Sequence, residues 1–260
     1  LVKAALEVAG HAADIVRHFC PGFINIFQEG LITQDNSNID FLNSFDAALK
    51  HPKTHIIIIA TEYLKNHTFN DFDANNEKDT SIYSNKAYWR TRLANFLYME
   101  KASIATWHLG EYAVDDYKNY LKHNKIFYLP HYYAPNLTRV NHNQDTDKDI
   151  DFLFTGSQTD YRKGIITDLR NRGYNVVLGT TITASFHREN LLQRTKVSLN
   201  LKQYPDWPYA SPSRFHYHII NKSLLLTENC TYGCDIQPYV ITAPEDNFLE
   251  FCVDTLEAQN

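Results

Sequence analysis

The stretch Ile150-Asp-Phe-Leu-Phe-Thr-Gly-Ser157 decides how this chain folds. Its apolar residues form a short run that is typical of a buried strand, and a Gly-Ser turn follows directly. The next segment carries Ile165, Ile166 and Leu169 at the spacing of one helix face. A buried strand, a glycine-containing turn and an amphipathic helix, in this order, predict the first unit of a parallel α/β sheet.

The same alternation continues to the end of the chain. Three further short apolar runs predict strands over residues 175–178, 196–201 and 223–227. Amphipathic segments between and after them predict helices over residues 185–194, from Ser211 onward and over 245–256. Ser211 and Pro212 suit the N-cap and the first position of their helix. We therefore predict a Rossmann-like domain over residues 150–260.

The first half of the chain repeats this alternation less regularly. The clearest strand is expected over residues 55–60, and Trp89, Leu93 and Phe96 predict a long helix over 85–101. The remaining expected elements are helices over 2–9, 41–50 and 111–122 and strands over 13–19, 23–27, 103–109 and 125–129. Residues 136–149 are polar and predict a linker. We thus expect an N-terminal α/β domain over residues 1–135.

Composition and charge narrow the classes of function. The 260 residues are 43% hydrophobic and 21% charged, which excludes collagen-like and wholly disordered chains. A net charge of -5 offers no footprint for duplex nucleic acid, so we expect no nucleic-acid partner. The longest strongly apolar run, residues 56–60, is far shorter than the roughly 20 residues that span a bilayer. We expect no transmembrane segment, while peripheral membrane contact stays compatible with this composition.

The cysteines favour a reducing environment. Four cysteines are too few for a disulfide scaffold in a chain of this size. Residues 1–16 lack the basic leader and the continuous apolar segment of a signal peptide, so we expect a cytoplasmic protein. Cys230 and Cys234 lie close together, but they fit core or surface cysteines better than a zinc site. We expect neither a metal nor a cofactor.

Anion-binding features gather after the predicted strands of the second domain. Ligands of open parallel sheets bind beyond the carboxyl ends of the strands, where loop amides and helix N-termini converge. The candidates at these ends are Gly156, Ser157, Arg162, Lys202, Ser213, Arg214 and Glu228. An arginine is unfavourable near a helix N-terminus, so a bound anion explains Arg214 better than a structural role does. The glycine turn alone could equally be a tight connection with solvated basic residues.

Three titratable residues follow predicted strands of the first half. Glu62 comes after residues 55–60, His108 ends the strand over 103–109, and His131 follows the strand over 125–129. A histidine, or a carboxyl group whose pKa is raised by burial, can take a proton from an acceptor hydroxyl. Each of the three is a candidate base, and a structural role is the alternative for each.

Several segments together resemble a known enzyme family. The stretch from Asp151 to Ser157 with Arg162, the run Lys196-Val-Ser-Leu-Asn-Leu201, and the segments Arg214-Phe-His-Tyr217 and Leu224-Leu-Leu-Thr-Glu228 resemble the C-terminal domain of GT-B glycosyltransferases. The likeness is greatest to the bacterial spore-maturation-protein-like and group 1 glycosyltransferases. Ala60-Thr-Glu62, Trp107-His108 and Tyr128-Leu-Pro-His131 look like the acceptor-side domain of that group. The resemblance implies two Rossmann-like domains that face each other across a cleft.

This resemblance implies a transferase that uses a nucleotide-sugar donor. The C-terminal domain of such enzymes holds the donor's diphosphate at a glycine-containing turn and a helix N-terminus, which makes the seven candidates above donor contacts. Helix dipoles and basic side chains offset the charge of the leaving diphosphate, so no metal is needed. The sugar would pass to a glycan, lipid-linked or protein acceptor, with His108, Glu62 or His131 as the base.

The sequence departs from the family pattern in two places. The Glu-x7-Glu pattern of retaining GT-B enzymes is absent, and the glycine-rich first strand of the N-terminal domain is missing, which predicts a truncated N-terminal domain. The stereochemical outcome of the reaction therefore stays open. Two rival functions also stay open: a nucleotide-sugar epimerase of the same fold, which needs no acceptor, and a non-catalytic sugar- or nucleotide-binding module.

Overall fold

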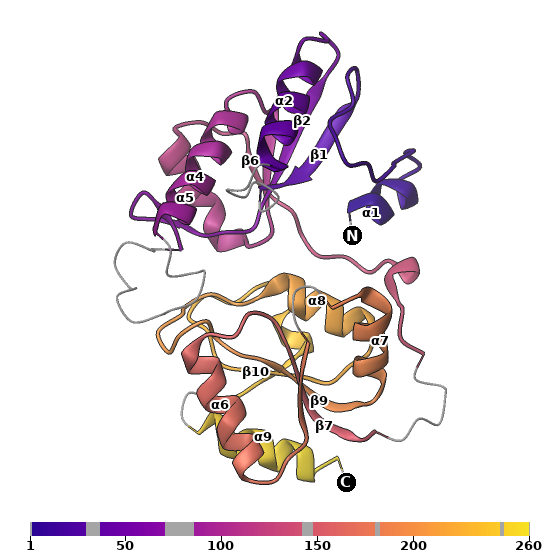
Figure 1. Ribbon diagram of the computed structural model, residues 1–260, viewed down its shortest axis with the longest axis vertical. Coiled ribbons are helices and arrows are strands. Elements are labelled where there is room, and N and C mark those ends of the chain that lie inside the picture. Colours follow the sequence, from indigo (N-terminus) through magenta and orange to yellow (C-terminus); the bar gives the residue numbers. More distant parts are fainter. Residues whose placement is uncertain are drawn as a thin grey trace. The chain divides into compact units, whose positions relative to one another are not determined.

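The computed structural model divides into two compact units, and each is described by itself (Figure 1). It describes residues 2–29, 37–70, 86–141, 148–179, 183–244 and 247–259. Unit 1 comprises Leu1–Ala12 and His131–Asn260, and unit 2 comprises Ala13–Pro130. The chain therefore passes from one unit to the other after Pro130, and the first helix belongs with the C-terminal half.

Unit 1 is built on a five-stranded parallel sheet with the strand order β11-β10-β9-β7-β8. Its strands are β7 (Ile150–Thr155), β8 (Val176–Gly179), β9 (Thr195–Asn200), β10 (Leu225–Thr227) and β11 (Ile241–Thr242). Its helices are α1 (Val2–Val8), α6 (Asp160–Asn171), α7 (Ser185–Gln193), α8 (Pro212–Ile220) and α9 (Phe248–Glu257). Counted along the chain, the five strands lie in the order 2-1-3-4-5, which is a doubly wound arrangement.

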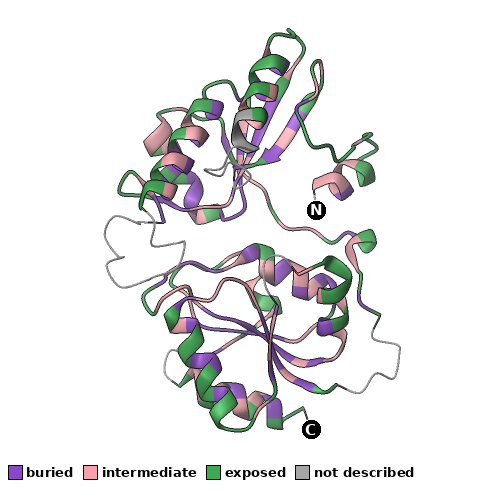
Figure 2. Ribbon diagram, viewed as in Figure 1, coloured by how far each residue is buried: buried purple, intermediate pink, exposed green. Residues whose placement is uncertain are grey.

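Helices cover both faces of this sheet. Phe152 and Phe154 of β7 pack with residues of α6 and α9 in one apolar cluster. Figure 2 shows that the strands of this sheet are largely buried. Leu153, on the other face of the same strand, packs with Leu191 and Leu192 of α7. Because strand residues alternate between the two faces, one continuous apolar run supplies both clusters. The run at 150–155 thus becomes the centre of a two-sided core.

Unit 2 contains a four-stranded parallel sheet with the sequential order β1-β2-β5-β6. Its strands are β1 (Ile24–Gln28), β2 (His55–Ala60), β5 (Ala105–His108) and β6 (Ile126–Tyr128), beside the short pair β3 (Leu64–Lys65) and β4 (Thr68–Phe69). Its helices are α2 (Ser37–Leu49), α4 (Lys86–Glu100) and α5 (Val114–Leu121). The predicted α/β character of both halves of the chain is confirmed.

The three helices of unit 2 pack on one face of its sheet. Phe27 of β1 lies 5.8 Å from Phe41 of α2 between ring centres, and His108 of β5 lies 5.0 Å from Tyr117 of α5. Tyr117 in turn contacts Phe96 of α4 at 5.8 Å. On the opposite face Ile24 keeps 60% and Phe127 keeps 51% of its surface exposed. The sheet of unit 2 is therefore more open than that of unit 1.

Most predicted elements occur within a few residues of their expected bounds, and the exceptions have physical reasons. No strand forms over residues 13–19, where Ile15 and Val16 are exposed and pair with no neighbouring strand. The short strands β3, β4 and β11 lack a clear apolar pattern and were not expected. In the predicted linker, Arg139 and Val140 donate their backbone N–H groups to the Asn221 side chain, so this part of it packs on unit 1. Residues 142–147 of that linker lie outside the described residues.

Of the helices in the described parts of the chain, none combines the length and the hydropathy of a membrane span.

Candidate functional site

The carboxyl ends of β7 and β9 form the first candidate site. In a sheet of order 2-1-3-4-5, ligands bind where neighbouring connections leave on opposite faces, which here is between β7 and β9. Gly156 and Ser157 follow β7, and Lys202 follows β9. The structure therefore brings the predicted glycine turn and the predicted lysine to the same edge of unit 1.

Gly156 and Arg214 lie against each other at this edge. Gly156 has a φ of +152°, and a Cβ atom at this position would lie 2.9 Å from Nη2 of Arg214. Only glycine therefore allows both the backbone conformation and the close approach of the guanidinium. Arg214 also donates to the Asn200 side chain and lies over the Phe154 ring, with its Cζ 5.6 Å from the ring centre. The guanidinium is held by these contacts at the end of the strands.

The Arg162 guanidinium binds backbone carbonyl groups of two loops. Its Nε donates to the carbonyls of Leu201 and Lys202 at 3.2 and 2.8 Å, and its Nη1 donates to the Ser157 carbonyl at 2.9 Å. The side chain is buried and ties the loop after β7 to the end of β9. This geometry favours a positioning role for Arg162, whereas direct contact with a donor was expected.

A pocket of about 420 Å³ opens beside Lys202 and Glu228. Asn229, Cys230, Thr231, Pro244 and Phe248 complete its lining. Glu228 accepts a hydrogen bond from the Lys202 backbone N–H and another from the Tyr161 hydroxyl, so its carboxylate is fixed at the pocket wall. Burial and this carboxylate together raise the pKa of Tyr161, which stays a neutral donor. The pocket thus joins an oriented acid, a lysine and an apolar end formed by Pro244 and Phe248.

Helix α8 begins at Pro212, after the loop that follows β9. Pro212 takes the first helical position, and Ser213 is exposed in the first turn. The side chain of Ser211, at the N-cap, accepts no capping hydrogen bond. Unpaired N–H groups at a helix N-terminus favour a negative charge nearby.

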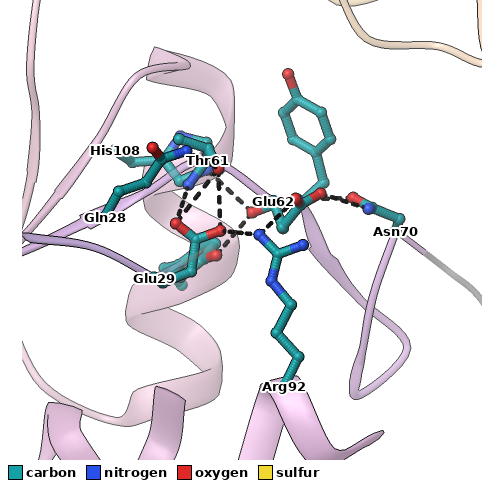
Figure 3. Close-up of polar contacts among 9 residues, drawn as sticks. Gln28, Glu29, Thr61, Glu62, Asn70, Arg92 and His108 are labelled. Atoms are coloured by element: carbon teal, nitrogen blue, oxygen red, sulfur yellow. Dashed lines mark hydrogen bonds and ion pairs between the residues drawn. The ribbon is translucent and has the colours of Figure 1, made fainter. Parts of the chain in front are cut away.

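The second candidate site lies at the carboxyl ends of β1 and β2 in unit 2 (Figure 3). Glu29 follows β1 and Glu62 follows β2, and both contact the same nitrogen, Nη2 of Arg92 on α4, at 2.8 and 2.7 Å. Glu29 also accepts from the Thr61 backbone N–H and hydroxyl, both at 3.0 Å. Glu62 accepts from the Asn70 side chain at 2.6 Å.

The two carboxylates differ in burial. Glu29 is fully buried, and burial raises its pKa to about 7, against the opposing pull of Arg92. The Glu62 side chain keeps 21% of its surface exposed. Two acids therefore share one guanidinium, and the Glu62 carboxylate is the one within reach of solvent.

His108 is fixed by the main chain. Its Nδ1 lies 2.9 Å from the backbone nitrogen and carbonyl oxygen of Gly110, and its Nε2 lies 3.1 Å from the Glu62 carbonyl oxygen. Burial lowers the pKa of its imidazole, which keeps the ring neutral. Both ring nitrogens are thus engaged with backbone groups, and the arrangement favours a structural role for His108 over that of a base.

His131 belongs to unit 1, whereas Glu62 and His108 belong to unit 2. The side chain of Asp235 accepts from the His131 backbone N–H at 3.2 Å and lies 3.2 Å from Nδ1 of the ring. The Nε2 atom of the His131 ring is buried and has no hydrogen-bond partner among the described residues. The contact with Asp235 therefore fixes His131, which is the first residue of the second segment of unit 1.

Within the described residues, no group of three or more histidine, cysteine, aspartate or glutamate side chains could hold a metal ion. All four cysteines are free, and burial raises the pKa of the Cys230 and Cys234 thiols to about 11. Neutral thiols are poor metal ligands and poor nucleophiles.

Sequence reasoning missed Glu29, Arg92 and Asn200. The rule that found Glu62 also covers Glu29, since both follow a strand of the same parallel sheet. No spacing signal relates Arg92, in the middle of a helix, to either carboxylate. Asn200 is the last residue of β9, so the rule for strand ends was the available signal.

Comparison with known proteins finds a similarity in fold. No family model matches the chain, and no curated protein matches it. The crystal structure of TarM, a wall teichoic acid glycosyltransferase, is similar with a TM-score of 0.50 and 10% sequence identity. The similarity covers 91% of this chain and 48% of that chain, so this chain spans about half the length of its neighbour. At this identity the likeness shows the fold, and the Rossmann-like α/β architecture is confirmed.

Proposed function

We propose that the protein is a glycosyltransferase of the GT-B type that takes its sugar from a nucleotide-sugar donor. The observation that carries this proposal is the edge of unit 1, where Gly156 lies against Arg214 and where Lys202 and Glu228 line a pocket. The shared fold with TarM supports the same reading.

The donor's diphosphate would lie at the Gly156–Ser157 turn. Gly156 lets the Arg214 guanidinium lie against the backbone of this turn, and Arg214 and Lys202 supply positive charge. The exposed Ser213 adds a hydroxyl at the helix N-terminus. These groups offset the charge of the leaving diphosphate, so we propose a reaction that needs no metal ion.

The nucleoside would occupy the pocket of about 420 Å³. The oriented carboxylate of Glu228 can accept hydrogen bonds from ribose hydroxyls. Phe248 and Pro244 offer the base an apolar wall. Arg162 would support this site indirectly, because it fixes the two loops that carry Ser157 and Lys202.

The acceptor would be a glycan, a lipid-linked sugar or a protein, activated from unit 2. Of the three candidate bases, Glu62 has the accessible carboxylate, held by Arg92 and Asn70. General-base removal of a hydroxyl proton contributes about 10²- to 10⁴-fold to a rate. We assign this role to Glu62. We also propose a cytoplasmic location on the basis of the free cysteines.

The test is a thermal-shift panel of UDP-, GDP-, CMP- and dTDP-sugars on the whole chain. A ligand that binds the folded state raises its apparent melting temperature by mass action. We expect one nucleotide family to stabilise the protein and Arg214→Ala to abolish the shift. Arg172→Ala is the matched control, because this exposed arginine pairs with the exposed Glu250 of the same unit.

Two outcomes would redirect the assignment. No shift with any donor, in a protein shown to be folded, would contradict it. Donor turnover without dependence on any acceptor would favour the epimerase, and binding without turnover would favour the binding module.

A further inference from the structure

The Glu29–Arg92–Glu62 triad has an uneven charge balance. Two carboxylates contact one guanidinium nitrogen, so the triad carries a net negative charge when both acids are ionised. Glu29 lies fully inside the protein, and Arg92 is nearly so. A buried charge is costly unless it is fully paired, and here a single positive charge is divided between two negative ones.

Among the described residues, the groups that face Glu29 come from α4, the segment after β2, and α5. Arg92 comes from α4, Thr61 and Glu62 follow β2, and the charge of Glu29 is felt by the buried Tyr117 of α5. Tyr117 donates its hydroxyl to the Glu62 carbonyl at 2.7 Å and remains neutral because burial raises its pKa. Arg92 is therefore the only positive charge that touches Glu29 in the described part of the chain.

We infer that Glu29 is a positioning residue for Glu62, and that its charge, acting through the shared guanidinium of Arg92, decides how strongly that guanidinium holds the Glu62 carboxylate. This inference rests on the proposed function, in which Glu62 is the base. When Glu29 is ionised, Arg92 is shared and Glu62 keeps more of its own negative charge for a substrate proton. When Glu29 is protonated, Arg92 pairs with Glu62 alone, and the carboxylate is more fully neutralised.

The geometry sets the pH at which this change occurs. Glu29 has a pKa raised to about 7 by burial, so it gains or loses its proton in the neutral range. The proton comes from and returns to solvent as the triad opens, and no other bond is made or broken. Glu62 would thus share Arg92 with an ionised Glu29 above neutral pH and pair with Arg92 alone below it.

The test is a ¹³C-carboxyl NMR titration of the whole chain labelled at glutamate, without donor or acceptor. The two signals are assigned with Glu29→Gln and Glu62→Gln. We expect the Glu29 signal to titrate near pH 7 and the Glu62 signal to show an inflection at the same pH. In Glu29→Gln the inflection at Glu62 should vanish. Glu250→Gln, an exposed acid of the other unit, is the control that leaves both titrations unchanged.

A second variant covers the case in which Glu29→Gln does not fold. Thr61→Val removes one hydrogen bond that favours the ionised form of Glu29, so both inflections should move together to higher pH. A Glu62 signal that ignores the Glu29 titration would overturn the inference, as would a Glu29 that stays ionised from pH 5 to 9.

Activity gives the second readout once a donor is known. Glu29→Gln should lose about tenfold at pH 8, less than the 10²- to 10⁴-fold of a lost base, and should lose the rise in rate between pH 6 and pH 8. A lower rate with an unchanged pH profile would mean that Glu29 is merely structural. Because the NMR titration needs no substrate, failure of the proposed function and failure of this inference are distinguishable.

Discussion

The two units place charge differently at the carboxyl ends of their sheets. In unit 1 the strand order reverses between β7 and β9, and a pocket, a lysine and an arginine lie at the edge so formed. In unit 2 the strands follow in sequence, and Glu29, Arg92 and His108 fill the edge as buried groups that bond to one another and to the backbone. The first edge therefore places positive side chains beside a pocket, whereas the charged groups of the second edge hold one another in place.

This difference follows from topology. At a reversal of strand order, successive connections leave on opposite faces, which opens a crevice at the strand ends. A sequential order sends successive right-handed connections to the same face and opens no such crevice. The proposed ligand site of unit 1 would thus follow from its strand order, whereas the proposed role of unit 2 would depend on the side chains that its loops supply.

The largest effect is expected from Arg92→Ala in unit 2. Removing the one cation leaves two carboxylates without their shared partner, and breaking a buried ion pair in this way costs about 3–5 kcal/mol. Urea unfolding should show this loss in the free energy of unfolding. Arg172→Ala, which breaks an exposed pair, should change stability by less than about 1 kcal/mol. Equal losses in the two variants would contradict the role of Arg92 as the shared ion-pair partner of Glu29 and Glu62.

The next effect is a pH dependence that belongs to unit 2. A carboxyl whose pKa rises from 4.5 to about 7 on folding binds more protons in the folded state, so stability falls as pH rises through this window. Relative to wild type, Glu29→Gln should therefore gain up to about 3 kcal/mol between pH 5 and pH 8. Chemical unfolding of both proteins at each pH measures this difference. A difference that does not change with pH would contradict the assignment of the raised pKa.

Gly156→Ala should disturb unit 1 by a smaller amount. The positive φ and the close approach of Arg214 both penalise a Cβ atom, and such backbone strain costs about 1–3 kcal/mol. Gly164→Ala is the matched control, because its Cβ meets nothing within 4 Å and helix propensity favours alanine by about 0.5–1 kcal/mol. Thermal unfolding compares the two. If Gly156→Ala matched Gly164→Ala, the tight contact between turn and guanidinium would be refuted.

The smallest effect is expected on the open face of unit 2. Phe127 keeps 51% of its surface exposed, so Phe127→Ala should cost less than about 1 kcal/mol. Phe152→Ala in the two-sided sheet of unit 1 should cost about 3–5 kcal/mol. Urea unfolding of the two variants tests whether the sheets differ as described. Similar losses would mean that the face carrying Phe127 is covered in solution.

Sequence alone predicted the strands that carry continuous apolar runs. The runs at 55–60 and 150–155 became central strands because a buried parallel strand needs apolar residues on both faces. Residues 13–19 also carry apolar side chains but form no strand, since a strand needs a neighbouring strand to pair with.

Sequence reasoning identified candidate residues that directly follow a strand. It did not identify contacts between segments that lie far apart in the chain. Gly156 and Lys202 follow their strands directly, so the rule for strand ends found them. The role of Arg162 depends on carbonyls about 40 residues away in the chain, and that of Arg92 on a carboxylate 63 residues away. No local pattern encodes such contacts, because they exist only after the sheet has formed.

The most direct test of this account is an equilibrium titration of the donor selected in the thermal-shift panel, by calorimetry, on wild type, Arg214→Ala and Glu29→Gln. We predict that Arg214→Ala binds about 10- to 100-fold more weakly, because a charge-assisted hydrogen bond contributes about 1.5–3 kcal/mol, and that Glu29→Gln binds like wild type. Equal affinity of Arg214→Ala and wild type would contradict the placement of the donor at the edge of unit 1.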